Sequence, residues 1–225
     1  SVRRSYSPAT LSTNDLQFAA GSRLNPQLST TMSAMNARHL ELCAGDEWAD
    51  TVREHIISWL LDGVELGDDV LEIGPGPGRT TDILCTRVAK LTAVELDPDL
   101  AAKLAARFQG ANVEVINADA TDIPLPDNRF SSALCFTMLH HVPTAELQDR
   151  IFAEAARVLR PGGLFAGVDS MTSPDFLELH SDDICVPIDP DGLADRLLQA
   201  GFEDVDVYAG SAGRRFRFRA TKPGG

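Results

Sequence analysis

The residues best suited to hold a charged ligand lie in the stretch EIGPGPG at 72–78. Gly74, Gly76 and Gly78 stand at alternate positions, directly before the expected start of a helix near Arg79. Because glycine has no Cβ atom, its backbone can bend sharply and let a ligand approach closely. A helix that begins after such a turn points unpaired N–H groups and a positive dipole end at a carboxylate or phosphate. The stretch therefore predicts a cofactor-binding turn.

Acidic residues recur at the ends of the apolar runs around this turn. Glu72 ends the run before the turn, Glu95 ends the next run, and Asp119 follows the third. The carboxyl ends of parallel strands meet at one edge of an α/β sheet, which is where such sheets bind ligands. An acid at the end of the second strand suits the hydroxyl groups of a ribose. Glu72 has an alternative role, as a strand-end carboxylate that accepts hydrogen bonds from the turn.

Two adjacent histidines, His140 and His141, follow the apolar run 132–136. The pKa of histidine lies near neutrality, so one of these rings could take a proton from a hydroxyl group of a ligand bound at the same edge of the sheet. Neighbouring residues in a loop point to different sides, so we expect only one ring to face the ligand. We assign this role to His141, which is nearer to the following helix. The alternative is that both rings orient the loop by hydrogen bonding.

A possible set of metal ligands lies at His180, Asp182 and Asp183, with Asp169 at the end of an earlier apolar run. These side chains are not spaced on one element, and Asp-rich loops are usually solvated. We therefore expect no metal site. His39 lies in a short N-terminal helix that either packs at the edge of the sheet or closes over a ligand.

Short apolar runs alternate with segments of helical spacing from residue 69 onward, which predicts a parallel sheet covered on both faces. The connection 209–213 is too short for a helical crossover, so the last two strands must form an antiparallel hairpin. The fold class is therefore α/β, a Rossmann-like doubly wound sheet of seven strands with the last one antiparallel and helices on both faces. The expected strands are 70–73, 91–94, 113–116, 132–136, 164–168, 203–208 and 214–220. The expected helices are 35–43, one starting near 46, 79–89, 98–108, 144–159 and 189–201.

The first part of the chain differs in composition from the rest. Polar residues dominate 1–31 without any persistent period, so this segment is expected to be a disordered extension. Residues 32–225 are expected to form a single domain. Within it, helices at 32–66 would form a cap or edge, and 69–222 would form the core sheet.

Composition excludes several classes of function. The formal net charge of −13 provides no electrostatic footprint for nucleic acid. The four cysteines lie far apart without a CxxC pair, which indicates reduced thiols and a cytoplasmic protein. No apolar run is long enough for a membrane span. We expect a small-molecule partner and a monomer or homodimer.

Taken together, these features resemble the class I S-adenosylmethionine-dependent methyltransferases, and within them the small-molecule branch often grouped as type 11. The resemblance covers roughly 46–222. It rests on four stretches in order along the chain, EIGPGPG at 72–78, VELD at 94–97, ADA at 118–120 with LPD at 125–127, and RVLRPGG at 157–163.

The resemblance implies S-adenosyl-L-methionine as the cofactor. Its methionine part would lie across the glycine turn, its cationic groups near Glu72 and its ribose against Glu95. Leu96 would flank the adenine, Asp119 would accept a hydrogen bond from its amino group, and Ala120 would donate a backbone N–H. The implied cofactor-binding residues are Glu72, Gly74, Pro75, Gly76, Gly78, Glu95, Leu96, Asp119, Ala120, Phe136 and Thr137.

The implied reaction transfers a methyl group to a small molecule, at a hydroxyl or at a carbon of a quinone, lipid or sugar. The acceptor would be bound by 35–43, 140–143 and 170–189. One alternative is a non-catalytic protein that keeps the scaffold to bind the cofactor or a partner. A nicotinamide dinucleotide is disfavoured, because Arg79 stands where the G-x-G-x-x-G fingerprint has its last glycine.

Overall fold

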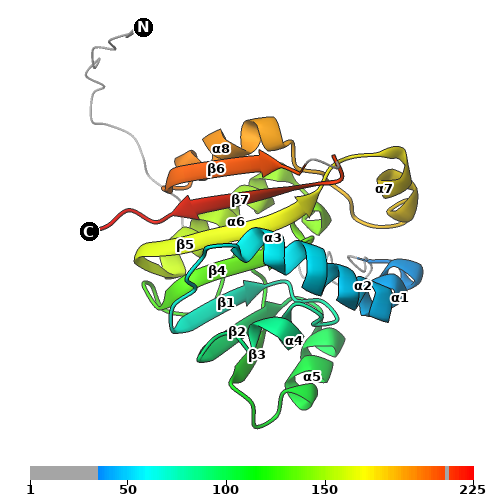
Figure 1. The fold of residues 1–225 in the computed structure, drawn as a ribbon, viewed down its shortest axis with the longest axis horizontal. Coiled ribbons are helices and arrows are strands. Elements are labelled where there is room, and N and C mark those ends of the chain that lie inside the picture. The colour runs from blue at the N-terminus through cyan, green and yellow to red at the C-terminus, as the bar shows by residue number, and fades with distance from the viewer. Residues whose placement is uncertain (1–34, 211–212) are drawn as a thin grey trace, which may run out of the picture. The chain divides into compact units, whose positions relative to one another are not determined.

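The computed structural model describes residues 35–210 and 213–225. Its strands form one seven-stranded sheet in the order β3-β2-β1-β4-β5-β7-β6 (Figure 1). The strands are β1 (Asp69–Ile73), β2 (Lys90–Glu95), β3 (Val113–Asn117), β4 (Phe130–Phe136), β5 (Leu159–Ser170), β6 (Glu203–Ala209) and β7 (Arg215–Thr221). The disorder expected for 1–31 lies outside the described residues.

Strand directions confirm the expected fold class. β1 pairs in parallel with β2 and β4, β2 with β3, and β4 with β5. β7 runs antiparallel to both β5 and β6. The chain is therefore an α/β protein with a Rossmann-like sheet whose last strand is antiparallel. The strand order reverses between β1 and β4, and open α/β sheets bind ligands outside the carboxyl ends of the strands at such a point.

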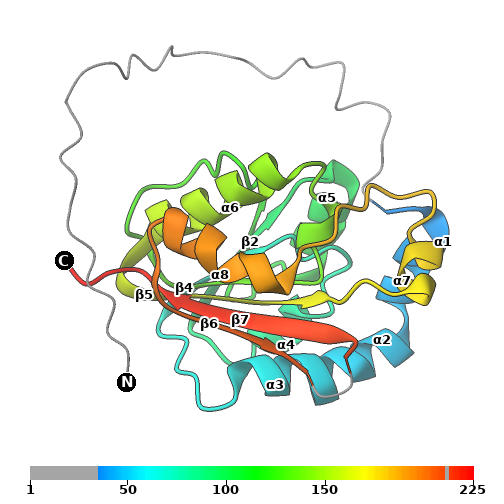
Figure 2. The ribbon, with the colours of Figure 1, turned by 90° about the horizontal axis from the view of Figure 1, so that it is seen from above.

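Helices cover both faces of the sheet (Figure 2). On one face, α6 and α8 bury apolar side chains such as Phe152 and Leu197 against the strands. On the opposite face, η2 and α4 bury side chains such as Ile56 and Leu84. Within the described ranges, no helix is long and apolar enough to cross a membrane. The helices are α1 (Ala37–Ala44), α2 (Asp46–Thr51), η2 (Val52–Ile57), α3 (Ser58–Leu61), α4 (Thr81–Leu84), α5 (Pro98–Arg107), η3 (Leu139–His141), α6 (Ala145–Val158), α7 (Pro174–Leu179) and α8 (Pro190–Gln199).

The N-terminal elements α2, η2 and α3 follow one another without a break, and η2 is π-helical. Val52, Ile56, Ile57 and Leu60 are almost completely buried along it. A π-helical turn accommodates an extra residue relative to an α-helix and is frequent at functional sites. This helical segment therefore buries an apolar stripe on the sheet while its first half reaches the edge where ligands bind.

The helix expected at 79–89 is wrong in length, because α4 ends at Leu84. Asn112, which lies in the connection before β3, donates from Nδ2 to the carbonyl oxygens of Cys85 and Val88 at 2.9 and 2.8 Å. These contacts from outside the helix satisfy carbonyl groups that helical N–H groups would otherwise bind. The α-helix therefore ends at Leu84, and a turn connects it to β2.

β5 begins at Leu159, earlier than the expected strand at 164–168. The backbone N–H of Gly162 donates to the carbonyl oxygen of Lys222 at 2.9 Å, and the N–H of Lys222 donates to Gly163 at 2.8 Å. This pairing with the C-terminal segment keeps the Pro-Gly-Gly sequence in the sheet as a bulge, in which Gly162 has a φ of 76° and the register to β4 shifts.

The segment before α8, expected to be irregular, contains α7. The Ser173 side chain accepts a hydrogen bond from the N–H of Phe176 at 3.1 Å, and Pro174 occupies the first helical turn. Serine at the N-cap followed by proline is a recognised start signal, so this helix was readable from the sequence.

Close packing at Gly167 leads to a stability prediction. A Cβ atom there would lie 2.6 Å from the ring of Phe218 and 2.7 Å from Cys135 Sγ. Gly167→Ala should therefore overpack the core and lower the free energy of unfolding by about 1–3 kcal/mol. Gly192→Ala in α8 is the matched control, because a Cβ there meets nothing within 4 Å. It should be neutral or stabilising by up to about 1 kcal/mol, and equal melting temperatures for the two variants would contradict the packing.

Candidate functional site

The glycine turn after β1 adopts a backbone conformation that depends on its glycines. Gly74, Gly76 and Gly78 have φ values of 64°, 55° and 81°, in the left-handed region. The N–H of Gly74 donates to the carbonyl oxygen of Val94 at 2.9 Å, so the turn also stays attached to β2. A side chain at these positions would be strained, which explains the sequence pattern.

Glu95 connects this turn to the start of α5. Its Oε2 accepts the backbone N–H of Gly76 and its Oε1 accepts the N–H of Asp97, both at 2.9 Å. Burial raises the pKa of this carboxyl above its ordinary value, although both backbone hydrogen bonds oppose the shift. Asp97 in turn caps α5, since its carboxylate accepts the N–H groups of Asp99 and Leu100.

Glu72 is buried at the start of α4. It is 1% exposed, and its carboxylate accepts hydrogen bonds from the hydroxyls of Thr80 and, at 2.7 Å, Thr81. Burial raises the pKa of Glu72 to about 7, more than these two hydrogen bonds lower it. These contacts match the alternative role considered from the sequence, a strand-end carboxylate bound by the segment that follows it.

Two connected cavities open along the carboxyl edge of the sheet in the described part of the chain. The larger has about 860 Å³ of empty volume and the smaller about 490 Å³, both open to solvent. The larger is lined by Met35, Gly74, Gly76, Val94, Glu95, Leu96, Ala118, Asp119, Ala120, Thr121, Met138, His141, Val142, Pro143, Leu147 and Ile151. The smaller is lined by Met35, Cys43, Trp48, Val52, Ile56, Gly74, Pro75, Gly76, Pro77, Arg79, Thr80, Phe136, Thr137, Met138 and His141.

Most residues expected at the site therefore line one or both cavities, and the exceptions are Glu72, Gly78 and His140. Gly78 faces α5 instead, where a Cβ atom would lie 2.3 Å from Leu104 Cδ2. Its carbonyl oxygen accepts a hydrogen bond from Arg107 at 2.9 Å. The glycine there allows the helix to pack closely.

The rings of His140 and His141 lie close together, with centroids 4.2 Å apart, and do not point to different sides as expected, but only His141 lines the cavities. His140 is 2% exposed, and its Nδ1 lies 2.5 Å from Oδ1 of Asp169. His141 lines both cavities, and its Nδ1 lies 3.1 Å from the carbonyl oxygen of Ile184. Burial, and next the neighbouring ring of His140, lower the pKa of His141 to about 3, so this ring is neutral near pH 7.

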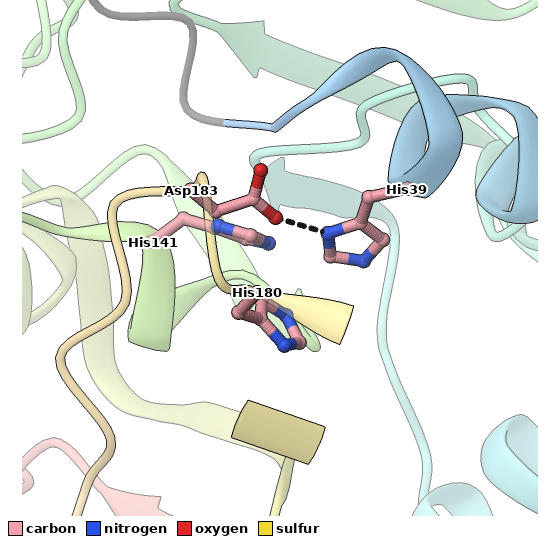
Figure 3. Close-up of side chains that lie close together, drawn as sticks. All are labelled: His39, His141, His180 and Asp183. Carbon is pink, nitrogen blue, oxygen red and sulfur yellow. Dashed lines mark hydrogen bonds and ion pairs between the residues drawn. The ribbon is translucent and has the colours of Figure 1, made fainter. Parts of the chain in front are cut away.

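The structure also brings His39 and His141 to His180 and Asp183, two residues that the sequence analysis had grouped as possible metal ligands. Imidazoles of His39, His141 and His180 meet the carboxylate of Asp183, and His39 Nδ1 lies 2.7 Å from Asp183 Oδ2 (Figure 3). Asp182, which the sequence analysis grouped with His180, is not part of this set. The members come from three segments, 37–44, 139–143 and 174–184, which we call the cover. In Figure 1, α1 and α7 of the cover lie at the edge toward which β1 and β5 point.

Comparison with known proteins agrees with this fold. Residues 71–167 match a family model described as a methyltransferase domain. A probable S-adenosylmethionine-dependent methyltransferase of Mycobacterium tuberculosis is 32% identical over 165 residues, which are 70% of this chain and 57% of that protein. A fatty-acid O-methyltransferase of Mycolicibacterium smegmatis is 34% identical over 114 residues, 50% of this chain and 40% of that protein. The chain thus matches less than two thirds of the length of either relative.

A solved S-adenosylmethionine-dependent methyltransferase from Aquifex aeolicus has the same fold, with a TM-score of 0.66 and 18% identity. The match covers 83% of this chain and 98% of that one. The sheet thus has the Rossmann-like fold of this methyltransferase. The family match over 71–167, together with the named relatives, shows a class I S-adenosylmethionine-dependent methyltransferase domain, whose cofactor is S-adenosyl-L-methionine.

The residues that line the cavities fit this cofactor. Gly74 and Gly76 line both cavities and contribute no side chain to them, and Glu95 places a carboxylate at the larger one. A Cβ atom at Gly76 would point to Met35, 3.8 Å from its Cε, on the cavity side of the turn.

A first site prediction concerns this turn. Gly76→Val should abolish binding of S-adenosyl-L-methionine in calorimetry, because the branched side chain would occupy the cavity and strain the turn. Gly110→Val is the matched control, since Gly110 also has a positive φ of 81° but faces open space. That variant should lose stability and keep wild-type affinity. Retained affinity in Gly76→Val would show that the cofactor binds elsewhere.

A second prediction follows from Glu72. Its pKa of about 7 exceeds the ordinary value of 4.5, so the protonated carboxyl stabilises the fold fully below pH 4.5. That contribution disappears as the pH rises through 7, because the unfolded state ionises first. Glu72→Gln, which stays neutral, should therefore gain stability relative to wild type between pH 5 and 8, by up to roughly 3 kcal/mol. Urea unfolding measures this, and parallel pH curves would contradict it.

Proposed function

We propose that this chain transfers the methyl group of S-adenosyl-L-methionine to a small-molecule acceptor with an apolar body. The observation that carries the proposal is the junction of the two cavities. They share Met35, Gly74, Gly76, Met138 and His141, so a cofactor in one would meet an acceptor in the other at the glycine turn.

The larger cavity suits the adenosine part of the cofactor. Glu95 can accept hydrogen bonds from ribose hydroxyls, and Asp119 and Ala120 lie where an adenine edge would be read. Leu96 is 62% exposed and offers an apolar surface to the ring. The glycine turn, Phe136 and Thr137 would hold the methionine part, and Glu72 would act through Thr80 and Thr81 behind the turn. The bound cofactor supplies a sulfonium-activated methyl group.

The part of the smaller cavity beyond Phe136 and Thr137 suits the acceptor. Trp48, Val52 and Ile56 form an apolar wall on the N-terminal helical segment. Apolar walls with a few polar groups are typical of small-molecule sites. The similarity to a protein named as a fatty-acid O-methyltransferase supports a lipid-like acceptor that carries an oxygen. The protein would mainly align the acceptor with the methyl group and exclude water.

The catalytic role expected for His140 and His141 stays a prediction. We now propose a different role for each ring. His141 is the one in contact with both cavities, so it would touch the acceptor. His140 pairs with Asp169 behind it and would act as a positioning residue.

A cytoplasmic location is proposed on the cysteines, since Cys43, Cys85, Cys135 and Cys185 are all unpaired.

Labelled cofactor and a panel of fatty acids, quinones, phenols and sugars test the proposed function. Trp48→Ala should raise the KM for the acceptor by about 10-fold or more, as expected for lost pocket contact, and leave cofactor affinity unchanged. Trp59→Ala is the matched control on the same helical segment, because Trp59 packs beside Tyr208 and Arg217. Its KM should equal the wild-type value.

Two results would contradict the proposal. If the protein binds the cofactor but methylates nothing in the panel or in fractionated extracts, the non-catalytic alternative is supported instead. If Trp59→Ala and Trp48→Ala raise the KM equally, the acceptor does not bind in the smaller cavity.

A further inference from the structure

Four side chains of the cover converge on one point (Figure 3). One nitrogen or oxygen atom from each of His39, His141, His180 and Asp183 lies within 4.8 Å of the others. They come from α1, η3, the C-terminal end of α7 and the loop that follows it. Imidazoles and carboxylates are the ligands that divalent first-row transition metals bind in proteins.

His141 presents an unused nitrogen lone pair to this point. Its Nδ1 faces the carbonyl oxygen of Ile184 at 3.1 Å, and a carbonyl only accepts hydrogen bonds. Nδ1 therefore carries the proton, and Nε2 of the neutral ring has the lone pair. This Nε2 is buried without a hydrogen-bond partner among the described residues. A buried polar atom in that state costs free energy unless a ligand satisfies it.

The Nδ1 of His180 is also held by a carbonyl group: it donates to the carbonyl oxygen of Phe176 at 2.6 Å, which leaves the lone pair on Nε2. Unlike Nε2 of His141, this atom has a partner, Nε2 of His140 at 3.2 Å, and an ion bound at the cluster would replace that contact. A backbone carbonyl that fixes the second nitrogen of a histidine is the arrangement found behind most metal-bound histidines.

Asp183 supplies the negative charge. Its side chain is fully buried, and its Oδ2 lies 2.7 Å from Nδ1 of His39. The other oxygen, Oδ1, accepts the backbone N–H of Asn36, which also caps α1. The carboxylate is thus held in place by the backbone, and one oxygen stays directed at the three rings. A buried carboxylate is costly unless cations or hydrogen bonds compensate it.

We propose that His39, His141, His180 and Asp183 bind a divalent transition-metal ion, with Zn²⁺ preferred. Mg²⁺ and Ca²⁺ favour oxygen ligands and do not suit a set dominated by imidazole. Tetrahedral zinc with Zn–N distances of about 2.0–2.1 Å separates its ligand atoms by roughly 3.4 Å. Atoms that already lie within 4.8 Å of one another reach this spacing by small side-chain rotations. The proposal replaces the sequence expectation of no metal.

The ion would join the three segments of the cover. A site with four protein ligands is closed, as structural zinc sites are. Because His141 also lines both cavities, the ion would fix the wall between cofactor and acceptor. The lone pair on His141 Nε2 cannot serve both the ion and an acceptor proton. Metal binding and a general-base role for His141 therefore exclude each other.

The test uses the whole chain, freed of metals with a chelator and titrated with Zn²⁺ in a calorimeter. We expect one Zn²⁺ ion to bind per chain and to raise the Tm. Mg²⁺ should neither bind in the calorimeter nor change the Tm. His180→Gln and Asp183→Asn should each weaken Zn²⁺ binding by roughly 100-fold or more, because loss of an outer partner alone costs about 10–100-fold. X-ray absorption of the zinc-loaded wild type should show nitrogen and oxygen neighbours and no sulfur from Cys43 or Cys185.

His55→Ala is the matched control. His55 is the one histidine of the chain outside the cluster and the His140 pair, and its side chain is 71% exposed. This variant should bind Zn²⁺ as the wild type does. A wild type without saturable Zn²⁺ binding, sulfur neighbours at the ion, or His180→Gln and Asp183→Asn with unchanged affinity would overturn the proposal. None of these measurements involves an acceptor, so their failure would leave the methyl-transfer proposal untouched.

Discussion

The carboxylate of Glu95 organises the carboxyl edge of the sheet. Its two oxygens accept the backbone N–H groups of Gly76 and Asp97, both at 2.9 Å. Because β1 and β2 are neighbours, this one side chain holds the glycine turn against the start of α5. A buried carboxylate is stable only with such partners, and the turn in turn depends on a fixed acceptor. The wall shared by the two cavities rests on this link.

Local signals explain why much of the fold and of the cofactor site could be predicted from the sequence. The Asp97-Pro98 and Asp189-Pro190 pairs mark helix starts, and both helices begin there. Alternating glycines and acids at strand ends placed Glu95 and Asp119 at one edge, since parallel strands end together. Contacts between distant residues were not readable in this way. Asn112 shortens α4 from outside the helix, and Thr80 and Thr81 draw Glu72 away from the cavities.

The residues of the cover are a stronger example of contacts that could not be predicted from the sequence. His39, His141 and His180 lie on separate segments, and no spacing along the chain relates them. Their meeting depends on side-chain directions, which follow from individual hydrogen bonds such as that of His141 Nδ1 to Ile184. The sequence analysis grouped His180 with both Asp182 and Asp183, and only Asp183 of these two belongs to the cluster in the structure. This cluster of side chains from distant segments is therefore the part of the protein that could not be predicted from the sequence.

The π-helical segment η2 has a consequence for how this protein can diverge. Val52 and Ile56 lie in the core under the sheet and also form the wall of the smaller cavity. A smaller side chain at either position would enlarge the space for a ligand and remove buried packing in the same step. New ligand preference and thermal robustness are thus in direct competition at these two residues. A lineage that changes one must first accumulate stabilising substitutions elsewhere.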